Sequence, residues 1–207
     1  MKKYILNNLL SYFFGFFFIF SPLAFAESVL DVTGEDFIMG GENAPITIIE
    51  YASLSCSHCA DFHINTLPEL IKEFVDTGKA RIVFRDFPFN YPALLGSMVL
   101  RCVPRDIRYE YSNALYHLQS KWVLRENAKT TQELYKIMQS GGMTKERFNE
   151  CIDNVDLENE ILNGLMAAQS EFNIKSTPSF LINGILIEGN KPIKDFRQII
   201  DKILSEQ

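Results

Sequence analysis

The sequence predicts an α/β protein in which one sheet is interrupted by a helical insertion. Two β-branched apolar runs, at 46–51 and 80–85, flank a helical pattern, which is the order of a βαβ unit with parallel strands. Two further apolar runs on either side of 183–184 predict a β-hairpin. Helical periodicity fills 92–172. One compact unit of this kind suits a chain of 207 residues, 47% of them hydrophobic.

The first 26 residues have the pattern of a secretory signal peptide. Lys2 and Lys3 precede an uncharged stretch at 4–26 that ends in the small-x-small run Ala24-Phe25-Ala26. We expect cleavage after Ala26, since polar residues and a proline interrupt the stretch. The alternative is an uncleaved membrane anchor, because the stretch is long enough to span a bilayer. Both interpretations place the folded part beyond the membrane.

Residues 27–91 are predicted to form the first part of the sheet domain. The polar segment 27–44 is expected to be a loop that leads into the strand at 46–51, whose apolar residues predict burial on both faces. A helix follows to about residue 76, with a kink expected at Pro68. The strand at 80–85 completes the unit.

Residues 92–172 are predicted to form the helical insertion. Within it, Thr130-Thr131-Gln132-Glu133 has the pattern of a capping box that starts a helix, and Ser140-Gly141-Gly142 ends that helix.

Residues 173–207 are predicted to complete the sheet domain. The strand at 179–182 turns at Asn183-Gly184 into a second strand at 185–187. An amphipathic helix at 192–204 ends the chain.

The four cysteines and the net charge of −6 limit the possible functions. An acidic chain lacks the basic face expected of a nucleic-acid-binding protein, so no nucleic-acid partner is predicted. Four cysteines allow three pairings, and export would place them where disulfides persist. Because Cys56 and Cys59 are two residues apart on a turn, they are natural partners, which leaves Cys102 with Cys151.

The run Cys56-Ser57-His58-Cys59 predicts a redox-active dithiol, because a strand leads into it and a helix leaves it. Cys56 would lie in the first helical turn, where backbone N–H groups and the helix dipole stabilise a thiolate. His58 could add a positive charge or a donor, unless it is only a surface residue. Cys59, one turn further, would resolve the mixed disulfide. A purely structural disulfide here would restrain little of the unfolded chain.

A zinc or copper site is the main alternative for these cysteines. It would need Cys102 and Cys151 as further ligands, with His63 or His117 nearby. We therefore predict neither a metal nor an organic cofactor.

Two further features accompany the dithiol. Cys102 and Cys151 lie on apolar helix faces, which favours a structural disulfide, although a pair that tunes Cys56 remains open. Glu50 ends a buried strand and could accept or relay the proton of Cys59, since an acid is costly to bury without a purpose. The alternative is that Glu50 lies at the exposed end of that strand.

These residues resemble the DsbA-type thiol–disulfide oxidoreductases of the thioredoxin superfamily, on the alphaproteobacterial-like branch. The resemblance rests on Gly41–Pro45, Glu50 to Cys59, Arg85–Pro88 and Ser176–Gly184. It implies a thioredoxin fold with an inserted helical domain, and a cis Thr177–Pro178 peptide that faces the dithiol and binds substrate through the backbone of Thr177.

The resemblance also bears on single residues. Glu50 matches the buried acid of the family, and Cys102 with Cys151 resembles the second, non-catalytic disulfide of this branch. Well-known members carry proline at the position of Ser57, so the resemblance does not fix the redox potential.

The expected function is a periplasmic dithiol oxidase that introduces disulfides into exported polypeptides with free thiols. A DsbB-type, quinone-linked membrane oxidase would reoxidise it, and we expect a monomer. The first alternative is a disulfide isomerase or reductase, although 27–44 is too short for an N-terminal dimerisation domain. The second is a metal-binding or chaperone-like module of the periplasm.

Overall fold

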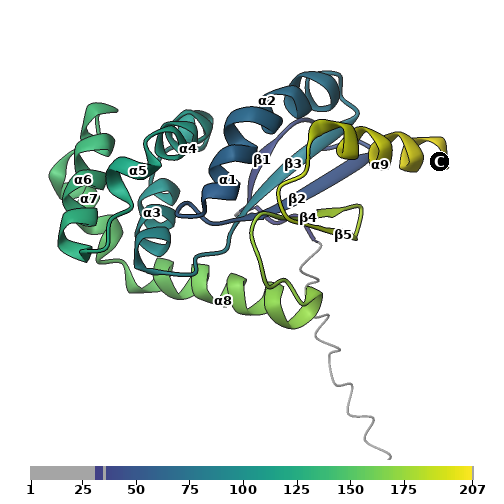
Figure 1. The fold of residues 1–207 in the computed structure, drawn as a ribbon. Coiled ribbons are helices and arrows are strands. Elements are labelled where there is room, and N and C mark those ends of the chain that lie inside the picture. Colours follow the sequence, from purple (N-terminus) through teal and green to yellow (C-terminus); the bar gives the residue numbers. More distant parts are fainter. Residues whose placement is uncertain (1–30, 35, 207) are drawn as a thin grey trace, which may run out of the picture.

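The computed structural model describes residues 31–34 and 36–206. The predicted signal peptide at 1–26 lies outside the described residues. The described part of the chain forms a five-stranded mixed sheet in the order β1-β3-β2-β4-β5. Helices cover both faces of the sheet, and a block of helices lies at one end of it (Figure 1). The predicted α/β fold with an inserted helical region is confirmed.

The strands pair largely as the sequence predicts. They are β1 (Phe37–Met39), β2 (Ile46–Ala52), β3 (Ala80–Asp86), β4 (Ser179–Ile182) and β5 (Ile185–Glu188). Strands β2 and β3 are parallel, which confirms the βαβ unit. Strands β4 and β5 form the predicted hairpin, and both Asn183 and Gly184 have the positive φ that such a turn requires.

Strand β1 corrects the expectation that 27–44 is only a loop. It pairs antiparallel with the edge of β3. Three partly buried residues are too few to display an alternating pattern, so the sequence alone did not indicate this strand.

The helices divide into those next to the sheet and those of the insertion. The first group is α1 (Ser57–Asp61), the π-helical η1 (Phe62–Thr66), α2 (Leu67–Leu70), the π-helical η2 (Ile71–Val75) and α9 (Ile193–Ser205). The insertion holds α3 (Tyr91–Arg101), the 3₁₀ turn η3 (Arg105–Ile107), α4 (Arg108–His117), α5 (Gln119–Trp122), α6 (Asn127–Ser140), α7 (Lys145–Ile152) and α8 (Val155–Phe172).

The helix after the dithiol changes its hydrogen-bond pattern just before Pro68. In η1 the N–H of Leu67 donates to the carbonyl of Phe62, five residues earlier. Pro68 then lies in the first turn of α2, where a missing N–H costs little. A π-helical turn is a recognised cause of a local bend, so the interruption expected at Pro68 is taken up by the turn that precedes it.

The predicted start of the helix at Thr130 is wrong. Helix α6 begins at Asn127, one turn earlier, and Thr130 is buried inside it. Its hydroxyl bonds both the N–H and the C=O of Leu124, so it fixes the preceding loop instead of capping the helix. The predicted end is confirmed, since α6 stops at Ser140 and Gly142 has a φ of +99°.

The apolar core has three parts that fix the position of the dithiol. Ile46 and Ile48 of β2 pack with η1, α2, η2 and α9 on one face of the sheet. Ile49 and Tyr51 face the other way, where Ala168 of α8 covers them. Figure 1 shows α8 running from the helical block along this second face. The third part fills the helical block around Trp122.

No helix in the ranges 31–34 and 36–206 combines the length and the apolar character needed to cross a bilayer.

Candidate active site

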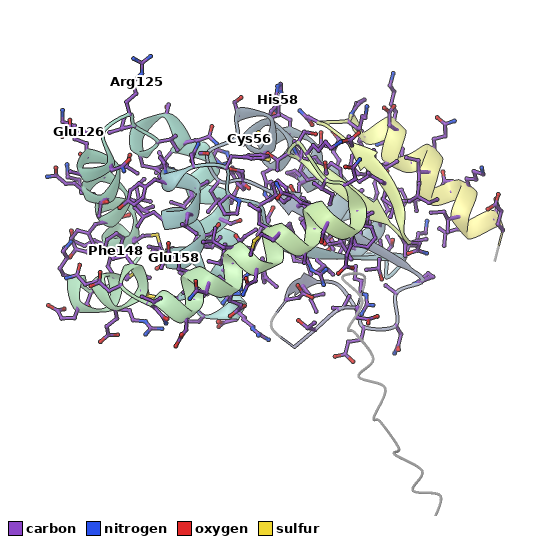
Figure 2. The ribbon with its side chains drawn as sticks, turned by 90° about the horizontal axis from the view of Figure 1, so that it is seen from below. Cys56, His58, Arg125, Glu126, Phe148 and Glu158 are labelled. Carbon is purple, nitrogen blue, oxygen red and sulfur yellow. A yellow bond between two sulfur atoms is a disulfide. The ribbon has the colours of Figure 1, made fainter. Side chains whose placement is uncertain are left out.

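Cys56 lies where the loop after β2 becomes helix α1. Its backbone is extended (φ −85°, ψ 123°), and the helix begins at the next residue. Its N–H bonds the carbonyl of Ser53 at 3.0 Å, and the side chain of Gln119 in α5 donates to the carbonyls of Leu54 and Cys56 at 2.9 and 3.0 Å. The insertion therefore holds the dithiol loop in place. Figure 2 shows Cys56 and His58 at the same rim of the molecule.

The surroundings of Cys56 favour its thiolate. The side chain of Cys59 contributes most, because it hydrogen-bonds the Cys56 sulfur and lowers its pKa. Burial works in the opposite direction, while the Thr177 side chain and the N–H groups of Cys59 and His58 add to the lowering. Together they lower the pKa of Cys56 to about 5. His58 lowers the pKa of Cys56 through its backbone N–H. The side chains of Ser57 and His58 are exposed.

Cys59 is in the opposite state. It is fully buried, and its sulfur accepts the N–H of Ser53 at 3.5 Å. Burial is the main cause that raises the pKa of Cys59 well above that of a free thiol, and the hydrogen bond with Cys56 and the charge of Glu50 act in the same direction. Both cysteines are thiols in this structure. One sulfur is therefore ready to ionise, and the other retains its proton.

The Thr177–Pro178 peptide bond is cis, as the family resemblance implied. The Cys56 Sγ donates to the carbonyl oxygen of Thr177 at 3.3 Å. The Thr177 hydroxyl is buried without another hydrogen-bond partner among the described residues, and it acts on the Cys56 sulfur, whose pKa it helps to lower. Pro178 is buried and has no N–H to compete for the thiolate.

Glu50 lies beneath the dithiol and is fully buried, so the alternative of an exposed strand end is wrong. Its two carboxylate oxygens each lie 3.1 Å from Nε2 of His63. The sequence reasoning weighed His63 only as a metal ligand and missed this pair. A signal was present, because His63 follows Cys59 by four residues and so lies on the same side of a helix.

The other two cysteines are joined to each other. The Cys102–Cys151 disulfide links the end of α3 to α7, with a Cα–Cα distance of 6.2 Å. These sulfurs are therefore not available as thiolate ligands, which removes the metal site that required them. Within the described part of the chain, no group of three or more His, Cys, Asp or Glu side chains is arranged to hold a metal ion.

Two features of the surroundings bear on substrate and proton access. Phe89 and Tyr91 are 52% and 41% exposed, and Asn90 between them accepts a hydrogen bond from Ser55 at 3.0 Å, one residue before Cys56. A cavity of about 410 Å³ lies between the sheet and helices α3, α4 and α8 of the insertion, and His63 and Tyr116 are among its lining residues. We call it the rear cavity.

Comparisons with known proteins agree with this arrangement. A family model described as thioredoxin matches residues 32–202. A Rickettsia conorii relative, provisionally named a protein-disulfide oxidoreductase, is 30% identical over 182 residues, which are 85% of this chain and 63% of that protein. The chain thus spans slightly under two thirds of that relative. The Bacillus subtilis disulfide bond formation protein D is 23% identical over 180 residues, or 81% of this chain and 76% of that protein.

A solved structure is similar over most of its length. The crystal structure of alpha-DsbA1 from Wolbachia pipientis superposes with a TM-score of 0.80 and 29% identity, and covers 86% of this chain and 95% of that one.

Proposed function

The chain belongs to the thioredoxin family, among its DsbA-like disulfide oxidoreductases, and from this premise we propose that it is a periplasmic dithiol oxidase. It would introduce disulfides into exported polypeptides by exchange at Cys56 and Cys59.

The observation that carries this proposal is the difference between the two sulfurs. A pKa of about 5 for Cys56 means that the reduced protein holds a stabilised thiolate at neutral pH. A pair whose reduced form is stabilised is a strong oxidant, because its disulfide is readily given away. The stabilised reduced form therefore favours the transfer of electrons from substrate thiols to this protein, which oxidises the substrate.

The exchange proceeds in two steps. A substrate thiolate attacks Cys56 Sγ, the Cys56–Cys59 bond breaks, and Cys59 leaves as a thiolate that takes up a proton. A second substrate thiolate then attacks the substrate sulfur of the mixed disulfide. The substrate disulfide forms, and Cys56 departs as a thiolate. In the reverse direction Cys59 loses its proton, attacks Cys56 and releases the substrate.

Three neighbours assist these steps. Glu50 gives a proton to Cys59 or accepts one from it, which is supported by its effect on the pKa of Cys59. His58 supplies its backbone N–H to the Cys56 sulfur. Ser57 is the first residue of α1, the helix whose N–H groups at Cys59 and His58 act on the sulfur.

The substrate is proposed to bind as an extended chain beside Thr177. The backbone of Thr177 lies within hydrogen-bond distance of the Cys56 sulfur, so a strand paired with it would bring its own cysteine to the dithiol. The exposed rings of Phe89 and Tyr91 offer loose apolar contact beside the loop that precedes Cys56.

The location and partners of the protein are part of the proposal. The signal-peptide pattern at 1–26 supports export to the periplasm and cleavage after Ala26. Reoxidation is assigned to a DsbB-type, quinone-linked membrane oxidase, and the protein is proposed to act as a monomer.

The experiment that tests the proposal separates oxidase from isomerase activity. The oxidised protein is mixed with a reduced model polypeptide and, separately, the reduced protein is mixed with scrambled ribonuclease. We expect stoichiometric disulfide transfer in the first mixture and little refolding in the second. Strong refolding of scrambled ribonuclease with weak disulfide transfer would favour the isomerase alternative.

A further inference from the structure

The contact between Glu50 and His63 is a buried ion-pair arrangement outside the dithiol itself. His63 is 3% exposed and Glu50 is 0% exposed, and Nε2 reaches both carboxylate oxygens. An unpaired carboxylate in such a place would be strongly destabilising. The imidazole Nε2, within hydrogen-bond distance of both oxygens, therefore fixes where the carboxylate points.

The second ring nitrogen of His63 is in an unusual position. Nδ1 is buried and has no hydrogen-bond partner among the described residues. Most buried polar atoms are paired, so an unpaired one calls for an explanation. Among the described residues, the polar contact of this ring is therefore the one that Nε2 makes with Glu50.

We propose that His63 is a positioning residue for thiol–disulfide exchange, which holds the Glu50 carboxylate ready to move the proton of Cys59. The proposal rests on the function given above, because it names the residue that lets Glu50 do its part.

The proposed proton transfer from Cys59 to Glu50 takes place in the resolving step. The S–H proton of Cys59 passes to Glu50 as the Cys59 sulfur attacks Cys56. A Cys56–Cys59 bond forms, the bond from Cys56 to the substrate sulfur breaks, and the substrate leaves as a thiolate. In the oxidising direction Glu50 returns the proton to the departing Cys59 thiolate.

The rear cavity reaches this pair at His63. His63 is one of its lining residues, and a volume of about 410 Å³ is ample for water. The charged and titratable groups around the pair come from several elements. Tyr116 of α4 packs on His63 and interacts electrostatically with Cys59, Glu50, Asp86 and Cys56. Asp86 of β3 and Arg101 of α3 line the rear cavity together with His63.

The ring of Tyr116 supports the position of His63 without touching the carboxylate through any contact described. The two ring centroids lie 4.1 Å apart. His117→Phe makes the same substitution at an exposed histidine of α4, which makes it a matched control for His63→Phe.

The test uses the aromatic disulfide dithionitrobenzoate. Its reaction with the Cys56 thiolate releases one coloured thiol, and the attack of Cys59 on the resulting mixed disulfide releases a second. We expect His63→Phe to slow the second release at neutral pH by about tenfold, with the first release unchanged, because only the second needs a base. His63→Gln can still donate an N–H to Glu50, so it should recover part of the lost rate.

The Glu50→Gln background decides between positioning and a general structural effect. If His63 acts through Glu50, His63→Phe will not slow the second release further in that background. An equal slowing in both backgrounds, an unchanged second release, or a His63→Gln rate no better than that of His63→Phe would overturn the proposal. His117→Phe should match the wild type.

This experiment also separates the inference from the proposed function. The second release needs no polypeptide substrate, so a wild-type protein that fails to oxidise polypeptides would reject the oxidase function alone.

Discussion

The sulfur of Cys56 lies 3.3 Å from the carbonyl oxygen of Thr177, a residue 121 positions later in the chain. Strands β2 and β4 are neighbours in the sheet, and this pairing brings the loop before β4 to the dithiol. The loop that we propose to bind the substrate therefore also contacts the reactive sulfur.

Thr177→Val is expected to raise the pKa of Cys56. Valine keeps the β-branched shape and the backbone carbonyl but removes the hydroxyl, which is one cause of the lowered value. The ultraviolet absorbance of the thiolate, followed against pH, measures the change. Ser176→Ala removes a hydroxyl from the exposed neighbour and should leave the titration as it is. An identical midpoint in Thr177→Val would show that the hydroxyl has no part.

Cys59→Ala is expected to have two effects. The pKa of Cys56 should rise, because the largest cause of its lowering is lost. Mixed disulfides should also accumulate on Cys56, and turnover should fall by about 100-fold or more, since the resolving thiol is absent. Mass spectrometry of the trapped species tests this, with Cys56→Ala as the variant that captures nothing. Normal turnover in Cys59→Ala would reject its assigned role.

The stability of the reduced protein should depend on the ionisation of Cys56. Its pKa is about 5 when folded, against about 8.5 for a free cysteine. A lowered pKa contributes stability above the unfolded value and loses it as the pH falls through the folded value. The free energy of unfolding of the reduced wild type, minus that of Cys56→Ala, should therefore grow with pH between these two values and then level off. Urea unfolding across this range measures it; a constant difference would contradict the lowered pKa.

Replacing Cys102 and Cys151 together by alanine should destabilise the protein without changing Cys56. The disulfide joins residues 49 positions apart, and the chain-entropy model gives roughly 4 kcal/mol for a loop of that length. Thermal unfolding measures the loss, and the thiolate absorbance of Cys56 is the control. A shifted Cys56 titration in this double variant would instead support the view that the second pair tunes the dithiol.

Much of the fold could be predicted because local pattern and long-range pairing agree. The apolar run at β2, the turn at Asn183 and the end of α6 are each determined by nearby residues. Strand β1 could not be predicted, because its pairing with the edge of β3 gives no pattern over three residues. Thr130 was misleading, since a hydroxyl that can cap a helix can equally bond the loop before it.

The dithiol could be located from sequence, whereas the spacing from Cys59 only places His63 on the same side of a helix and does not give its contact with Glu50. The Cys-x-x-Cys spacing and its strand–helix context identify Cys56 and Cys59. The partner of Glu50 depends on how the first helix turns against β2, and the π-helical turn at 62–66, which contains His63, adds to that uncertainty. A contact that depends on helical phase requires the folded structure.

The most direct measurement is the thiolate absorbance of Cys56 against pH, combined with the equilibrium of the dithiol with glutathione. We predict a midpoint near pH 5 and an equilibrium in which glutathione readily reduces the disulfide. A midpoint near the value of about 8.5 for free cysteine, with a disulfide that glutathione hardly reduces, would contradict the oxidase function.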